Sequence, residues 1–407
     1  MSAHERGSGC AGAGFCPFQL AGIAPVQPHT NRTTWTAVSA MFVLNGALYG
    51  IWASRIPAIA QLYDLDAGDL GWLLLLLAVG AIAAFPLAGR FADRLGAAFV
   101  TLRIAVLYTV ALGLIAIAPN VATLAVALAL FGAAHGAMDV AMNTWAGEAE
   151  THIGRPVMSS FHAMFSLGAG LGAASGFAAE HWGIGITLHF IPVGLVFAVI
   201  TLTWARIGWV SATQNTSQNT PLFPLPRGPL VAVGLIAFCT SMGEGAMVDW
   251  SALLLIEMTH ATAAHAALGY SVFSISMVIT RLLGDQVTRA LGPTPTARIA
   301  GGIATAGALC AIVSANYGAT LFGFALMGVG YAVIMPLAFS RAARDPHLSP
   351  GTAIASVSTL GYGGLLLGPP LIGFVAHATT LRTGFAVLVV LAALIVVLAG
   401  AVRAGRA

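Results

Sequence analysis

Apolar runs long enough to cross a lipid bilayer recur along almost the whole of this 407-residue chain. A membrane-spanning helix needs roughly 20 mostly apolar residues, and runs of about that length are separated here by short breaks. The pattern therefore predicts twelve membrane-spanning helices. Their approximate ranges are 34–60, 69–92, 98–118, 121–146, 157–181, 184–207, 229–257, 264–290, 296–315, 317–343, 352–378 and 382–402.

The composition agrees with a lipid environment. The chain is 58% hydrophobic and 8% charged, whereas a soluble domain carries roughly 25% charged residues. Its 48 glycines are unusual for a soluble helical protein but suit membrane helices, whose backbones approach closely at small residues. We therefore expect an all-α integral membrane protein.

A hydrophilic stretch divides the apolar runs into two sets of six. Residues 208–228 are rich in Ser, Thr, Asn, Gln and Pro, which is typical of a linker. The polar, glycine-rich leader lacks the regions of a signal peptide. We predict a disordered cytoplasmic tail at 1–33, a six-helix bundle at 34–207, a cytoplasmic linker at 208–228, a second six-helix bundle at 229–402 and a cytoplasmic tail at 403–407.

The two sets of helices resemble each other in sequence. Gly96 matches Gly292 at a shift of 196 residues, and Trp52 matches Trp250 at a shift of 198. Further glycines match at shifts between these values. A nearly constant offset indicates a duplicated six-helix unit with two pseudo-symmetric halves.

The arginines predict the orientation. All seventeen basic residues are Arg, and fifteen of them fall at or near the cytoplasmic side when the N-terminus is placed there. Only Arg55 and Arg382 fall on the other side. Because cytoplasmic loops are enriched in basic residues, we expect an inner-membrane protein with both termini cytoplasmic.

The loop between the second and third predicted helices reads GRFADRLG at 89–96. It resembles the signature loop of the major facilitator superfamily, although two alanines replace the basic pair that usually follows. The resemblance implies the fold of that superfamily. Gly89 would allow close helix packing, Asp93 and Arg94 would hold a cytoplasmic gate by charge, and Gly96 would turn the chain.

The second half carries a degenerate copy of this loop at 281–292. Arg281, Asp285 and Arg289 are four residues apart, so they share one helical face. We interpret them as part of the same gate. The alternative is a set of salt bridges with no active role.

Within the superfamily the chain resembles the branch of the fucose permease. The fourth helix reads AMDVAMN at 137–143, so Asp139 takes the place of that branch's acidic residue and Asn143 that of its Asn. The resemblance implies that Asp139 serves proton coupling. A second acidic residue of that permease, in the first helix, is replaced here by Ala53.

Charged groups at membrane depth cost about 2.5–3.5 kcal/mol on insertion scales, so each needs a reason. His135 and Asn143 lie four residues on either side of Asp139 and share its helical face. Glu244 lies between Gly243 and Gly245, which predicts a local break of the helix at a binding site.

The candidate residues fall into two further groups beside the gate. We assign proton coupling to Asp139, Glu244 and His162, the last because histidine titrates near neutral pH. Candidates for substrate contact are Asn45, Tyr49, Trp52, His135, Asn143, Phe161, Asp249 and Trp250. The alternative for these residues is a packing or interfacial role.

The sequence favours a secondary transporter. No phosphate-binding loop of ATP-driven pumps occurs, and no nucleophile–base set or metal-protease motif of a membrane enzyme. We expect a monomer in the bilayer, without cofactor, metal or nucleic acid, that takes up a sugar-like or other polar metabolite with protons. The alternative is a proton antiporter that exports drugs or metabolites.

Overall fold

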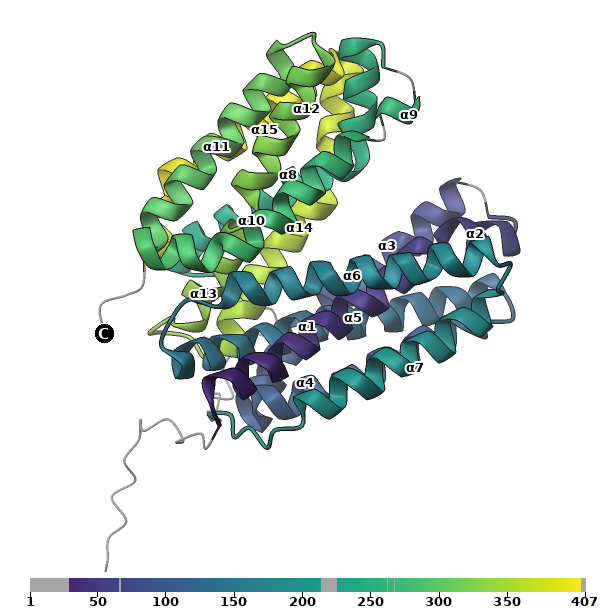
Figure 1. Cartoon of the computed structure of the whole chain (residues 1–407), viewed down its shortest axis with the longest axis vertical. Coiled ribbons are helices and arrows are strands. Elements are labelled where there is room, and N and C mark those ends of the chain that lie inside the picture. The colour runs from purple at the N-terminus through teal and green to yellow at the C-terminus, as the bar shows by residue number, and fades with distance from the viewer. Residues whose placement is uncertain (1–28, 66, 214–224, 262, 267, 404–407) are drawn as a thin grey trace, which may run out of the picture.

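The computed structural model shows a helical protein in two halves. It describes residues 29–65, 67–213, 225–261, 263–266 and 268–403. Most of the predicted N-terminal tail, the middle of the linker and nearly all of the C-terminal tail lie outside these described residues. The two halves meet at one end and diverge toward the other, so that α2 and α9 lie far apart at the ends that diverge (Figure 1).

The first half contains six long helices and one short one. They are α1 (Asn31–Ser54), α2 (Ile56–Leu62), α3 (Ala67–Leu95), α4 (Ala97–Ala116), α5 (Val121–Ile153), α6 (Met158–His181) and α7 (Ile186–Ala205). The second half repeats this plan with more interruptions. Its elements are α8 (Pro229–Thr259), α9 (Ala263–Ala266), α10 (Leu268–Leu291), α11 (Pro293–Val313), α12 (Tyr317–Tyr331), α13 (Ile334–Ala343), α14 (Pro350–Ala378), α15 (Leu381–Leu398) and the 3₁₀ turn η1 (Ala399–Val402).

Ten segments of the described chain are long and apolar enough to cross a membrane, with α12 and α13 counted as one segment. The long helices α6 and α10, of 24 residues each, complete six spans in each half. The prediction of an all-α membrane protein with twelve spans in two halves is therefore confirmed.

Proline explains the interruption of two predicted helices. We expected one helix at 34–60, but α1 ends at Ser54 and α2 starts at Ile56 with Pro57 in its first turn. We also expected one helix at 317–343, but it divides into α12 and α13 near Pro336. Proline has no N–H to donate and disturbs the preceding turn.

The fourth predicted helix is longer than the sequence indicated. It was expected to end at 146, but α5 continues to Ile153 and ends at Gly154, whose φ of 73° is left-handed. Glycine adopts this conformation without strain, which makes it a common helix terminator. The extension places Glu148 and Glu150 on the helix rather than in a loop.

The predicted break of the helix at Glu244 is wrong. Helix α8 runs unbroken from Pro229 to Thr259. Gly243 instead allows close packing, because a Cβ atom there would lie 2.4 Å from the Tyr331 ring. The glycine therefore serves contact between helices rather than an unwound backbone.

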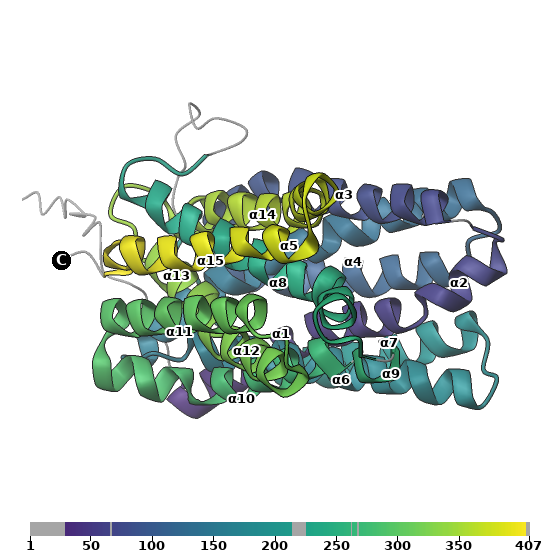
Figure 2. The ribbon, with the colours of Figure 1, turned by 90° about the horizontal axis from the view of Figure 1, so that it is seen from above.

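The halves meet through two equivalent pairs of helices. Helix α14 of the second half lies along α3 of the first, and α10 of the second half lies along α6 of the first (Figure 2). The first residues of α1 and the last described residues after η1 lie at the end where the halves meet (Figure 1). We call this end the closed end.

Candidate functional site

At the closed end, Asp93 of α3 caps a helix of the opposite half. Its carboxylate accepts hydrogen bonds from the backbone N–H groups of Gly351 at 2.8 Å and Thr352 at 3.1 Å. The Ser349 and Thr352 hydroxyls donate to it at 2.5 and 2.9 Å. A carboxylate at a helix N-terminus satisfies orphan N–H groups and interacts favourably with the helix dipole. The first turn of α14 is therefore bonded to the end of α3.

Asp285 of α10 makes the equivalent contact in the other direction. It accepts hydrogen bonds from the N–H groups of Ser159 at 2.9 Å and Ser160 at 2.8 Å, in the first turn of α6. Asp285 lies 192 residues after Asp93, and Gly351 lies 192 residues after Ser159. The two caps thus occupy the same positions of the duplicated unit.

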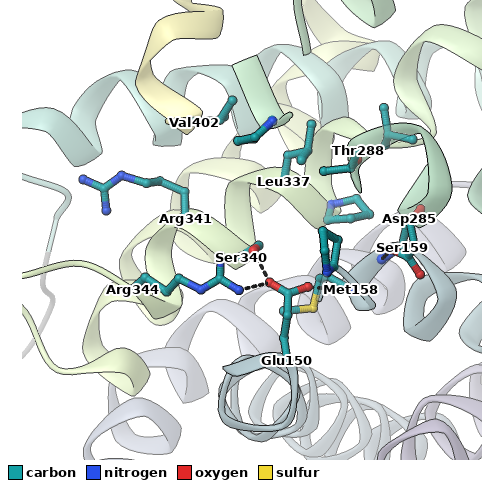
Figure 3. Close-up of a pocket in the computed structure, with 14 residues that line it drawn as sticks. Glu150, Met158, Ser159, Asp285, Thr288, Leu337, Ser340, Arg341, Arg344 and Val402 are labelled. Carbon is teal, nitrogen blue, oxygen red and sulfur yellow. Dashed lines mark hydrogen bonds and ion pairs between the residues drawn. The ribbon is translucent and has the colours of Figure 1, made fainter. Parts of the chain in front are cut away.

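A third carboxylate joins the halves beside these caps. Glu150 of α5 accepts hydrogen bonds from the N–H groups of Val157 and Met158, each at 3.0 Å. Its other oxygen faces the second half, where Arg344 donates at 2.7 Å and the Ser340 hydroxyl also donates. Glu150 lies at the edge of a cavity of about 70 Å³ (Figure 3), which is room for about two water molecules.

The remaining gate candidates differ in position. Gly89 packs against the backbone of Gly351, and Gly96, with φ of 95°, precedes α4. Arg94 and Arg289 are exposed near the ends of their helices. The structure thus places Gly89 between the two halves.

The first residues of the linker are fixed to the first half. The Trp209 ring N–H donates to the Glu148 carboxylate at 2.8 Å, and the Ser211 hydroxyl accepts from the N–H of Ala98 at 3.0 Å. Trp209 also packs edge-on against His152. The described start of the linker is therefore bound across α4 and α5. We call residues 207–213 the strap.

Polar residues of the first half form two clusters deeper in the protein. Asn143 donates from Nδ2 to the Asp139 carboxylate at 3.2 Å and to the Asp139 carbonyl at 2.8 Å. His135, in contrast, does not bond to Asp139. Its Nδ1 lies 3.0 Å from both Asn45 Oδ1 and the Tyr108 hydroxyl. The expected stripe of three side chains on α5 is therefore two separate groups.

Tyrosines lie beside both clusters. Tyr49 stacks on the His135 ring, with centroids 4.9 Å apart. Tyr362 of α14 packs on Phe85 and lies within electrostatic range of Asp139 and Tyr49. Because α14 belongs to the second half, this tyrosine brings the opposite half to the predicted coupling residue.

Arg281 lies one turn before Asp285 on α10, where its backbone carbonyl accepts a hydrogen bond from the Ser159 hydroxyl at 3.0 Å. Its Nη1 donates to the Ser166 hydroxyl of α6 at 3.0 Å, its Nε donates to the Ala332 carbonyl at 3.4 Å, and its Nη2 lies 3.7 Å from Glu244 Oε1. The Ala332 carbonyl is available because Pro336, four residues later, has no N–H to bond it. Arg281 thus bridges the two halves, and its role in the gate stays a prediction.

Several candidates for substrate contact or coupling lie inside the protein. Trp52 is 1% exposed and packs on Phe131 within the first half, and Phe161 is likewise buried, stacked on Phe42. Neither side chain has a surface for a solute in this conformation. His162 stacks on Phe339 of the opposite half, and its Nε2 has no hydrogen-bond partner among the described residues.

The two candidates near the diverging end of α8 differ from each other. Asp249 is exposed on α8. The neighbouring Trp250 is partly buried, and its ring N–H has no hydrogen-bond partner among the described residues. Neither takes part in the central clusters.

Sequence reasoning missed Glu150 and its partners because the fourth helix was ended too early. A signal was present: two glutamates, at 148 and 150, stand within seven residues of Gly154. Tyr108, Tyr362 and Ser166 were also missed. A lone Tyr or Ser in an apolar run carries no sign that distinguishes it from a packing residue.

Comparison of the sequence with known proteins identifies its family. Residues 37–349 match the sequence profile of the Major Facilitator Superfamily. The chain is 43% identical over 367 residues to an uncharacterised transporter of Sinorhizobium fredii, which covers 90% of this chain and 97% of that protein. It is 34% identical over 375 residues to the membrane protein MosC of Rhizobium meliloti, over 91% and 90% of the two chains.

The chain therefore belongs to the Major Facilitator Superfamily. It is a multi-pass membrane transporter and not an enzyme, as the sequence predicted.

Solved structures show the same fold. The fucose:proton symporter FucP of E. coli superposes with a TM-score of 0.74 at 15% identity, over 91% of this chain and 99% of that chain. The human organic anion transporter MFSD10 gives a TM-score of 0.74 at 15% identity, over 92% and 100%. At such identities the likeness concerns the fold alone.

Proposed function

We propose that the protein takes up a small polar metabolite, sugar-like in size, together with protons by alternating access. One observation carries the proposal: the bonds between the halves at the closed end are made by side chains capping helix ends. Such bonds can break and re-form without unfolding either half. Two solved structures of the same fold are named as a fucose and a xylose symporter with protons.

The closed end is the cytoplasmic end in this proposal. Arg90, Arg94, Arg341 and Arg344 all lie at or near it, and arginine is enriched on the cytoplasmic side of membrane proteins. Both chain termini then lie in the cytoplasm of a cell with this protein in its inner membrane. In this proposal the conformation is an outward-facing one, closed toward the cytoplasm by Asp93, Asp285 and Glu150.

Asp139 is the proposed proton-coupling residue. Its hydrogen-bond partner is Asn143, and no ion pair joins it to an arginine in the part of the chain that the structure describes. A carboxylate without a counterion at membrane depth is most stable when it takes up a proton. Asn143 Oδ1, which has no hydrogen-bond partner among the described residues, can accept a hydrogen bond from the protonated acid. The pair thus fits both protonation states.

Uptake into membrane vesicles, across sugars and organic acids with and without a pH gradient, tests the proposal. In Asp139→Asn, which mimics the protonated acid, proton-driven accumulation should fall to the background level. Exchange of labelled for unlabelled solute should survive, because it needs no net proton movement. Accumulation with unchanged pH dependence in this variant would assign Asp139 a structural role. If a proton gradient instead drives the solute out of the cytoplasmic compartment, that result would support the export alternative.

A further inference from the structure

Arg281 is a buried cation whose charge is incompletely matched. It is 8% exposed and lies near the middle of α10. The nearest carboxylate oxygen, Glu244 Oε1, is 3.7 Å from its Nη2, which is too far for a hydrogen bond. A buried guanidinium normally binds a carboxylate through two short parallel bonds. The observed ion pair is therefore a loose one.

The hydrogen bonds around Arg281 leave one side of its fork unused. A guanidinium has five N–H donors. One at Nε and one at Nη1 are bonded to Ala332 and Ser166, whereas Nη2 has no acceptor within hydrogen-bond distance among the described residues. Glu244 Oε1 also has no hydrogen-bond partner there.

We propose that Arg281 binds an anionic group of the transported solute, a carboxylate or similar oxyanion, and that Glu244 competes for the same guanidinium. This inference rests on the proposed function and names the substrate class of that site. The solute would bind where α6, α8 and α10 meet. Its oxyanion would accept from Nη2 and from the second N–H of Nη1.

The exchange balances in charge. Glu244 takes up one proton from water and becomes neutral, which releases the guanidinium for the solute's carboxylate. When the solute leaves, Glu244 gives up its proton and pairs with Arg281 again. One proton and one monovalent anion cross together, so the cycle moves no net charge through this site.

Other titratable groups face this site from each neighbouring helix. They are His162 on α6, Tyr270 on α10, and Tyr331 on α12. Tyrosine ordinarily titrates near pH 10, so between pH 5 and 8 only Glu244 and His162 are candidates for a change of charge. Replacing Glu244 and His162 one at a time separates their contributions to the pH dependence of ligand binding.

Acetate and acetamide are suitable probes, because they share a shape and differ in charge. The experiment follows the thermal unfolding midpoint of the purified full-length protein at constant ionic strength, since a ligand that binds the folded state raises it. In Glu244→Gln, acetate should bind at least about tenfold more tightly than in the wild type at pH 7, a coupling of ordinary size. Acetamide should have no effect on either protein.

Two further variants complete the test. Glu244→Gln combined with Arg281→Gln should lose the response to acetate, and Glu244→Gln with Arg281→Lys should keep a weaker one, which provides a cationic variant if the first fails to fold. In wild type and in His162→Gln, acetate binding should strengthen as pH falls. In Glu244→Gln it should be independent of pH.

The inference is overturned if acetate stabilises Glu244→Gln no more than acetamide does, or equally with and without Arg281. That result leaves the proposed function standing if Asp139→Asn still abolishes proton-driven accumulation of a neutral solute. Conversely, acetate binding at Arg281 without any proton-driven uptake would retain the site and reject the proposed function.

Discussion

The closed end contains two equivalent helix caps, which differ in the number of carboxylates that bind the capped helix. The first turn of α14 is held by Asp93 alone among the described residues, through four hydrogen bonds. The first turn of α6 is held by two carboxylates: Asp285 from the opposite half, and Glu150 from its own half. The first turn of α14 thus depends on a single acidic side chain, whereas the first turn of α6 is held by two.

The residues one helical turn before the two caps also differ. Gly89 brings the backbone of α3 against that of α14, whereas the equivalent position of α10 holds Arg281, 192 residues later. Both halves of the duplicated unit therefore have the cap, whereas the residue one turn before the cap differs between them. In the first half that position serves packing, and in the second half it supplies the central cation.

The largest effect is expected from Asp93→Asn compared with Asp285→Asn. A hydrogen bond to a charged group contributes about 1.5–3 kcal/mol, so loss of the Asp93 charge should favour opening of the closed end by about ten- to a hundredfold. Asp285→Asn should have a smaller effect, since Glu150 still holds α6. The measurement is the labelling rate of a cysteine introduced as Leu337→Cys, a buried residue of the closed-end cavity, with an impermeant maleimide. Equal rates in the two variants would show that the caps do not differ.

A smaller effect is expected from Gly89→Ala. The new Cβ would lie 2.7 Å from the Gly351 carbonyl oxygen, so backbone must move, at about 1–3 kcal/mol for overpacking. The thermal unfolding midpoint should fall and the labelling rate at the closed end should rise. Gly113→Ala is the matched control, because a Cβ there meets no atom within 4 Å. A midpoint unchanged in both variants would argue against the close backbone contact.

The smallest effect is expected from Trp209→Phe in the strap. The ring contacts remain, but the 2.8 Å hydrogen bond to Glu148 is lost, which is about 0.5–1.5 kcal/mol. Hydrogen exchange of residues 207–213 should speed up severalfold, whereas labelling at the closed end should stay within about twofold, because Trp209 and Ser211 bond the strap to the first half. Labelling as fast as in Asp93→Asn would instead make the strap part of the closure.

The sequence predicted the fold and one cap well, and the second cap less well. The signature loop identified Asp93, but the glycine matches gave an offset of 196, which places Arg289 opposite it. The structure equates Asp93 with Asp285, because α10 continues about one turn further beyond its cap than α3 does. A shift of four residues keeps the same helical face, so the spacings alone do not distinguish Asp285 from Arg289 as the equivalent of Asp93.

The partners of the caps could not be predicted at all. Ser349 and Thr352 lie more than 250 residues from Asp93, and only the packing of α3 on α14 brings them together. The same holds for Arg281, whose central role depends on a carbonyl that Pro336 leaves unbonded.

The low hydropathy of α6 and α10 affects the membrane topology that a sequence would predict. Both fall outside the segments that qualify as spans by length and apolar composition. A hydropathy scan that omitted them would still return an even number of spans and put both chain ends on one face. It would nevertheless invert α7 and α8 and move the linker to the opposite face, although Ser211 lies against the start of α4 at the closed end. Arg281 and Asp285, two of the charged residues that lower the hydropathy of α10, also join it to the other half. In this chain, the helices that look least like membrane spans therefore form one of the two pairs that join the halves.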